Sequence, residues 1–225
     1  MNIEFIKCIK ESKPAHQKDA IKNIFSWKEF ESLINLRPFV SSSRLRLLSN
    51  DEYSWPNQAW LTDVNTYPPS LLKNILKEKM GYFRDCTRIN SKINNMSKIL
   101  DELTGCPTDA HIYFSVIENE ISNQGFGIHN DMSHNLIVQV EGNTRFEIWD
   151  IKPKSKSRVN VDSVDIPPII DVLLSPGDIV YVPAYFLHRA TSKTKRLSIS
   201  FPSFAETSEN KSQDKEWLNI EEFVK

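Results

Sequence analysis

The chain has 225 residues, of which 40% are hydrophobic and 25% are charged, a composition typical of a globular protein with one substantial domain. Its 28 basic and 29 acidic side chains nearly cancel, and this balance excludes a global electrostatic attraction to nucleic acid or to an anionic membrane. Charged residues interrupt the N-terminal apolar run too early for a signal peptide, and no stretch approaches the roughly 20 apolar residues of a membrane helix. The 3 cysteines form no CxxC pair. We therefore expect a cytoplasmic protein with reduced thiols.

Helical patterns dominate the sequence before residue 108. The segment Ser26-Trp27-Lys28-Glu29 has the spacing of a capping box and predicts a helix that ends before Pro38. Alternating polar and apolar side chains over residues 44–48 predict a strand with one solvated face. Apolar stripes predict two further helices, over residues 70–80 and 90–103, which end at Gly81 and at Gly105. Residues 1–25 are weakly patterned, and we expect irregular structure or a short helix there.

Short runs rich in Val, Ile, Phe and Tyr take over after residue 108. Because no helices separate them, they favour an antiparallel sandwich or jelly roll, and Glu141-Gly142-Asn143 fits a hairpin turn. We therefore expect one structural domain: a helical region over residues 1–107, packed on a mostly β core over 108–205, and a tail over 206–225 with a short helix at 217–224. The predicted strands cover residues 111–117, 135–140, 145–149, 171–174, 178–182 and 196–201.

Two separated segments carry the strongest chemical signal. Residues 124–131 read QGFGIHND, and residues 177–188 read GDIVYVPAYFLH. His129 and Asp131 are two apart, so on a strand both side chains leave the same face. His188 can complete a set of two imidazoles and one carboxylate, which suits non-haem Fe(II) and leaves other metal positions open. The pattern predicts an Fe(II)-dependent oxygenase in which His129, Asp131 and His188 are the metal ligands and the catalytic centre.

Further segments extend this signal: Gly105-Cys106-Pro107 with Ile112-Tyr113, the sequence VQVEGNTRF over residues 138–146, and SPGDIVYVP over 175–183. Together with the two segments above, they resemble the JmjC-like, cupin-fold 2-oxoglutarate oxygenases, especially the branch with the ribosomal-protein hydroxylases. The resemblance implies a double-stranded β-helix with an N-terminal helical layer. It also implies Fe(II) as cofactor, and 2-oxoglutarate and dioxygen as co-substrates in the hydroxylation of a protein side chain or a small molecule.

One departure from the family pattern concerns the co-substrate. These enzymes usually hold the far carboxylate of 2-oxoglutarate with a Lys or Arg just after the QVEG-type turn, where this chain has Thr144 with Arg145 beside it. Related oxygenases outside the JmjC branch use an RxS on one strand face instead, and Arg binds carboxylates bidentately. We therefore favour Arg196 over Arg145 as the clamp. The residues expected to hold 2-oxoglutarate are Arg196, Ser198, Asn135, Tyr113 and Thr144.

The substrate side and two alternative functions stay open at this point. His111 stands where the ribosomal hydroxylases tend to have Asn, and a barrel-lining role is favoured over a fourth metal ligand. The chain ends soon after the predicted barrel, so we expect it to lack their dimerisation and winged-helix regions. One alternative is a cupin metalloenzyme that does not use 2-oxoglutarate, an isomerase or another dioxygenase, and the absent cation at Thr144 supports it. The other is a non-catalytic cupin module that binds a small ligand or a partner.

Overall fold

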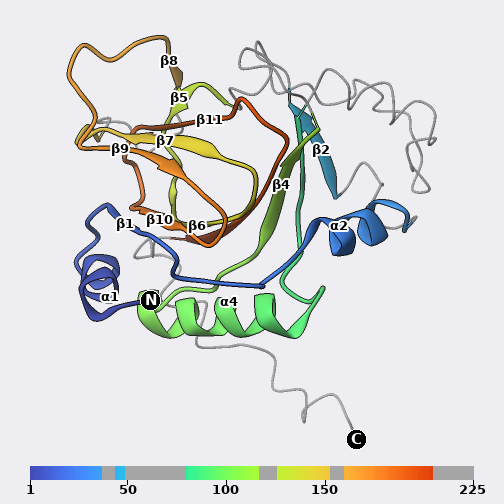
Figure 1. Cartoon of the computed structure of the whole chain (residues 1–225). Helices are drawn as coiled ribbons and strands as arrows, with labels where there is room; N and C mark the ends of the chain where they lie inside the picture. The colour runs from blue at the N-terminus through green and yellow to red at the C-terminus, as the bar shows by residue number, and fades with distance from the viewer. Residues whose placement is uncertain (37–43, 49–79, 117–125, 153–159, 205–225) are drawn as a thin grey trace, which may run out of the picture.

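Two antiparallel β-sheets face each other, and helices cover the outer side of the larger sheet (Figure 1). The computed structural model describes residues 1–36, 44–48, 80–116, 126–152 and 160–204. The larger sheet consists, in spatial order, of β1 (Ala15–Gln17), β10 (Ile179–Val182), β6 (Ser133–Glu141), β12 (Arg196–Phe204), β4 (His111–Ser115), β3 (Met80–Phe83) and β2 (Leu45–Leu48). The smaller sheet consists of β8 (Asn160–Val161), β5 (Ile128–His129), β11 (His188–Thr191), β7 (Thr144–Ile148) and β9 (Ile170–Leu174).

In the described residues, three helices accompany the sheets: α1 (Ile3–Lys10), α2 (Trp27–Ile34) and α4 (Ser91–Thr104). The predicted capping box begins α2, since Ser26 Oγ accepts from the Glu29 backbone N–H at 3.2 Å and donates to Glu29 Oε2 at 2.7 Å. Asn90 caps α4 by accepting from the Ile93 backbone N–H at 2.8 Å, and Gly105 ends the helix with a φ of 71°, a conformation that glycine adopts without strain. Both of these helices confirm the sequence prediction.

The main hydrophobic core lies between the helices and the larger sheet. Phe30 of α2 packs against Phe114 and Phe83, with ring centroids 4.6 and 6.0 Å away, and Ile93 of α4 is completely buried in the same cluster. A second, smaller cluster lies between the two sheets and includes Phe146, Ile148 and Val180. The helices therefore stabilise the larger sheet from outside and leave its inner face for the space between the sheets.

The predicted strands of the C-terminal half are present, and the structure adds others. Residues 15–17, expected to be irregular or helical, pair with β10 as an edge strand. Asp178 secures this edge, because its carboxylate accepts from the backbone N–H groups of Asp19 at 2.9 Å and Ser175 at 3.0 Å. Local pattern gives no sign of this pairing, because it joins residues about 160 positions apart.

One helix boundary was wrong. Met80 and Gly81 belong to β3, so the predicted helix over residues 70–80 does not end at Gly81; residues 70–79 lie outside the described part of the chain. The predicted helix over 217–224 also lies outside it, and the division at residue 107 stays a prediction. None of the helices in the described residues is long and apolar enough to span a bilayer.

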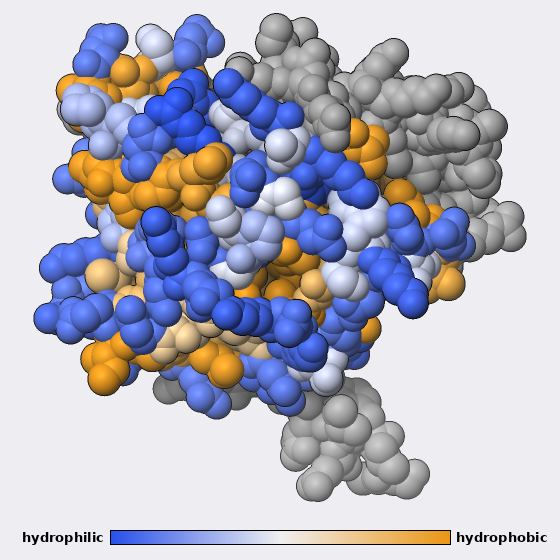
Figure 2. Space-filling model, in the orientation of Figure 1, coloured by the Kyte–Doolittle hydropathy of each residue, from blue (hydrophilic) through white to orange (hydrophobic). Residues whose placement is uncertain are grey.

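Apolar side chains reach the surface at the edge of the smaller sheet. Ile169 and Leu173 are more than half exposed beside or within β9, and Ile166 is half exposed. Figure 2 shows apolar atoms gathered over the side of the molecule where β7 and β9 lie. The apolar residues of β9 are thus divided between this surface and the inter-sheet core, as the alternation of a strand requires.

Candidate functional site

The pairing of β5 with β11 brings two histidines together. His129 ends β5, His188 begins β11, and the two are direct register partners whose rings lie 4.3 Å apart between centroids. Both are buried, whereas the Asp131 side chain, just beyond β5, is 29% exposed. The Tyr185 backbone N–H donates to the Asp131 carbonyl at 2.7 Å and ties this turn to the segment that leads into β11. Strand register therefore assembles residues that are about 60 positions apart.

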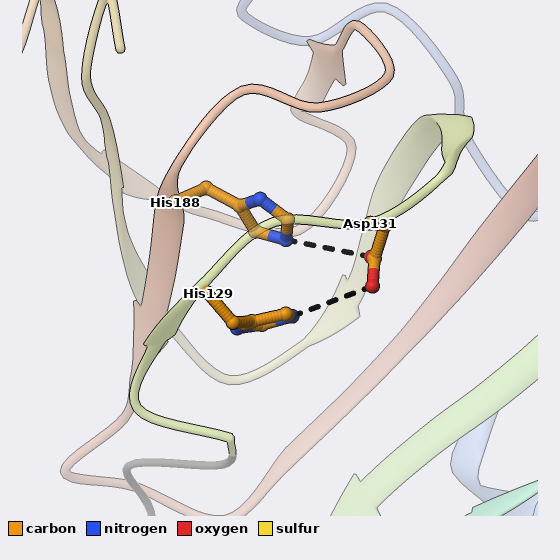
Figure 3. A group of neighbouring side chains, drawn as sticks. All are labelled: His129, Asp131 and His188. Carbon is orange, nitrogen blue, oxygen red and sulfur yellow. Dashed lines mark ion pairs between the residues drawn. The ribbon is translucent and has the colours of Figure 1, made fainter. Parts of the chain in front are cut away.

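The three side chains converge on one point (Figure 3). His129 Nε2 lies 3.7 Å from Asp131 Oδ1, and His188 Nε2 lies 3.6 Å from Asp131 Oδ2. One potential ligand atom from each residue lies within 4.8 Å of the other two. Among the described residues, this is the one group of three or more His, Cys, Asp or Glu side chains with such spacing.

Backbone carbonyls determine which ring nitrogens are available. His129 Nδ1 lies 3.1 Å from the Gly127 carbonyl, and His188 Nδ1 lies 3.0 Å from the Phe186 carbonyl. A carbonyl only accepts, so each Nδ1 carries the hydrogen and each Nε2 presents its lone pair toward Asp131. The Asn135 amide donates to Asp131 Oδ2 at 3.0 Å and orients the carboxylate. Acceptor atoms that face one another in this way fit a divalent cation, and two imidazoles with one carboxylate fit Fe(II).

The triad opens into a pocket between the sheets. The residues that line it alternate along their strands, as expected when every second side chain points inward. All eight residues predicted for the metal and co-substrate line this single cavity. The larger sheet contributes Tyr113, Asn135, Ile137, Arg196, Ser198 and Ser200, and the smaller sheet with its flanking turns contributes Phe126, His129, Asp131, Thr144, Phe146, His188 and Ala190.

Arg196 gives the pocket a buried positive charge. Arg196 is only 3% exposed, and this burial lowers the pKa of its guanidinium to about 10. Nη2 donates to Met80 Sδ at 3.7 Å, while Nε has no hydrogen-bond partner among the described residues. Thr144 Oγ1 is likewise buried without a partner in that part of the chain. The pocket thus holds a desolvated cation and an unused hydroxyl, which fits an anionic ligand.

Arg145 lies outside this pocket. It points from the other face of β7, where its guanidinium makes a bidentate pair with Asp171 at 2.7 and 2.8 Å. The Arg145 side chain is 54% exposed. Exposed pairs of this kind contribute about 0–1 kcal/mol to stability. Of the two arginines that the sequence offered, Arg196 therefore lines the pocket and Arg145 does not.

His111 belongs to a separate hydrogen-bonded group. Its Nε2 lies 3.1 Å from Asp109 Oδ2, and Thr87 Oγ1 donates to Asp109 Oδ1 at 2.7 Å. Burial by itself raises the pKa of Asp109, but these hydrogen bonds outweigh it and lower the pKa to about 2. His111 is not part of the converging ligand group.

Some residues that line the pocket were not predicted from the sequence. Ser200 continues the alternation of Arg196 and Ser198 along β12, and its hydroxyl lies 3.4 Å from Asn135 Oδ1. Extending the RxS pattern by two residues would have found it. The apolar wall of Phe126, Ile137, Phe146 and Ala190 carries no comparable signal, because such residues usually form plain core.

Comparison with known proteins decides the family. Residues 87–211, more than half of the chain, match the family described as JmjC domain. The chain belongs to the JmjC domain family. This match confirms the predicted resemblance to the JmjC-like oxygenases.

Two curated relatives of this JmjC protein are bifunctional lysine-specific demethylase and histidyl-hydroxylase NO66 proteins. The Drosophila melanogaster protein is 26% identical over 114 residues, which cover 48% of this chain and 17% of that protein. The Drosophila persimilis protein is 30% identical over 103 residues, covering 44% of this chain and 14% of that protein. The match thus spans less than a fifth of either relative.

The solved structure of YcfD, a ribosomal oxygenase from Escherichia coli in complex with cobalt and 2-oxoglutarate, is similar in fold. It superposes with a TM-score of 0.67 at 19% identity, covering 95% of this chain and 55% of that chain. The predicted jelly roll with a helical layer is confirmed by this likeness and by the two facing antiparallel sheets.

Proposed function

We propose that this JmjC protein is an Fe(II)- and 2-oxoglutarate-dependent hydroxylase. The observation that carries the proposal is one pocket that holds both a two-histidine, one-carboxylate triad and a buried guanidinium paired with no carboxylate among the described residues. When bound, Fe(II) supplies the oxidation chemistry: 2-oxoglutarate, dioxygen and a substrate C–H group yield succinate, carbon dioxide and a hydroxyl group.

The triad has the role of metal ligand in this proposal. His129 and His188 use Nε2, and their Nδ1–H groups, held by the Gly127 and Phe186 carbonyls, keep the rings in that orientation. Asn135 holds the Asp131 carboxylate. The three residues would hold the metal at the wall of the pocket, so that a chelating co-substrate could reach it from the pocket.

Arg196 has the role of carboxylate clamp. A guanidinium binds a carboxylate with two parallel hydrogen bonds, and these are strongest where water is excluded. Thr144 and Ser198 add hydroxyl donors from opposite walls, and Tyr113 adds a third. The cation that the family usually has after the QVEG-type turn is absent, but a cation from β12 serves the same pocket. This removes the main support for a cupin enzyme that does not use 2-oxoglutarate.

The proposed substrate is a side chain of another protein. Both the histidyl-hydroxylase relatives and the ribosomal oxygenase of similar fold support this class over a free metabolite. Incubating purified ribosomal proteins with the enzyme, Fe(II) and 2-oxoglutarate tests it directly. Mass spectrometry should then find the gain of one oxygen atom on a defined residue, and its absence from every protein would argue against this class.

The activity itself is tested without a known substrate. Isothermal titration of 2-oxoglutarate into anaerobic Mn(II)-loaded protein should show binding, and the Fe(II) protein should convert 2-oxoglutarate slowly to succinate. His129→Ala and Asp131→Ala should lose metal binding and succinate formation, whereas His16→Ala, a change on β1 outside the pocket, should keep both. Absence of 2-oxoglutarate binding in the wild type, or normal succinate formation in a triad variant, would contradict the proposal.

A further inference from the structure

The immediate surroundings of Arg196 contain a soft acceptor instead of a charged one. The guanidinium donates a hydrogen bond through Nη2 to Met80 Sδ at 3.7 Å. Met80 is 1% exposed and lies on β3, two strands away from β12 in the sheet. It forms, with Tyr82, Tyr113 and Phe126, an aromatic and thioether cluster that is separate from the main core.

This cluster forms a continuous wall beside the pocket. Tyr82 and Tyr113 are register partners on β3 and β4, and their rings stack at 4.9 Å with an interplanar angle of 14°. Tyr113 and Phe126 also line the pocket, and Phe126 lies 5.2 Å from the His129 ring. Met80 is buried in the same cluster, and its sulfur contacts Arg196.

The identity of the acceptor has a physical consequence. A carboxylate at this position would pair with the guanidinium, neutralise it and occupy its donors, so an incoming carboxylate would have to displace it. A thioether sulfur accepts weakly and carries no charge. It can fix the direction of one N–H group while leaving the charge of Arg196 and its Nε donor available.

We propose that Met80 is a positioning residue for co-substrate binding, which orients the Arg196 guanidinium without neutralising it. The inference rests on the proposed function of the pocket. It assigns a role in 2-oxoglutarate affinity to a buried residue that lies 116 positions before Arg196 and does not itself line the cavity. Met80 does not touch the reacting atoms, so its effect falls on binding and not on the chemical step.

Two substitutions test the role. Met80→Leu keeps the volume and removes the sulfur acceptor, and should raise the Kd of 2-oxoglutarate about tenfold, as expected for one weakened hydrogen bond to a charged group. The kcat for succinate formation at saturating 2-oxoglutarate and the affinity for Mn(II) should stay unchanged. Met80→Glu places a carboxylate beside the guanidinium and should abolish 2-oxoglutarate binding while the protein still binds Mn(II).

Met96→Leu on α4 is the control, because it makes the same exchange at a partly buried position packed against the main core and should leave every value unchanged. A Met80→Leu protein with wild-type affinity for 2-oxoglutarate overturns the inference. So does a variant that loses Mn(II) affinity and kcat to the same extent, because that result indicates a general structural role. If the wild type fails to bind 2-oxoglutarate, the proposed function fails instead, so the two failures are distinguishable.

Discussion

Replacing Arg196 with methionine should separate stability from function. The pKa of the guanidinium falls from 12.5 to about 10 because the charged form is desolvated. At about 1.4 kcal/mol for each pKa unit, this corresponds to a cost of about 3 kcal/mol for burying the charge. Because the folded-state pKa is depressed for a base, the cost is fully present below about pH 10 and therefore at neutral pH. An apolar side chain of similar length avoids it.

The same substitution should remove the carboxylate clamp. Charge-assisted hydrogen bonds contribute about 1.5–3 kcal/mol each, so losing even one strong pair costs about 3 kcal/mol, or roughly a hundredfold in the Kd of 2-oxoglutarate. We therefore expect Arg196→Met to unfold at higher urea concentration than the wild type, with a free energy of unfolding larger by up to about 3 kcal/mol. Saturating 2-oxoglutarate should cancel most of that difference, because a hundredfold tighter binding stabilises the wild type by about 2.7 kcal/mol relative to the variant, whereas Mn(II) stabilises both proteins through the triad.

Urea denaturation with and without ligands, combined with titration calorimetry, measures both effects. Arg145→Met is the control, since Arg145 is on the outer face of β7 and should leave 2-oxoglutarate affinity intact. The reasoning is refuted if Arg196→Met binds 2-oxoglutarate like the wild type. A variant that is less stable than the wild type in the absence of ligand would refute the assignment of Arg196 as an uncompensated buried charge.

Two further changes test the hairpin turn at Gly142 and the hydrogen-bonded group around Asp109. In Gly142→Ala, at a φ of 68°, the added Cβ collides with the Lys195 carbonyl, so the free energy of unfolding should fall by about 2–3 kcal/mol and 2-oxoglutarate binding should weaken. Gly105→Ala is the control, since Gly105 has a similar φ but open space around it. Its free energy of unfolding should fall by about 1 kcal/mol, and its 2-oxoglutarate binding should not change. Asp109→Asn should lower the free energy of unfolding by about 1–2 kcal/mol above pH 4, after allowance for partial exposure. Because the pKa of Asp109 is depressed, the difference should vanish as the pH falls toward 2, and a pH-independent difference would contradict the role of its charge.

The sequence predicted the strands of the C-terminal half well because alternation and turn residues are local signals. Gly142 illustrates this, since its positive φ closes the β6–β7 hairpin at the predicted place. The spacing of His129 and Asp131 was similarly informative. The sequence also offered His188 as the third ligand, but the β5–β11 register that brings it to the other two is specified by no local pattern.

Other features could not be predicted from local sequence patterns. Met80 shares an apolar stripe with the preceding residues, so periodicity favoured a helix, yet tertiary pairing with Leu48 on β2 places it in a strand. The contact between Met80 and Arg196 follows from the pairing of β3 with β4 and of β4 with β12, and it has no trace in the sequence. The edge strand around His16 was missed for the same reason, because its pairing with β10 joins distant parts of the chain. Long-range pairing overrides local propensity at these positions.

The position of β12 has a consequence for how the molecule is assembled during synthesis. In the larger sheet, β1, β10 and β6 form one group and β4, β3 and β2 form another, and β12 alone joins them (Figure 1). β12 is the last strand of the described chain. The two groups therefore cannot be joined by backbone hydrogen bonds until residues 196–204 have emerged from the ribosome. The strand that closes the sheet also delivers Arg196, so an incompletely folded chain should be unable to capture 2-oxoglutarate.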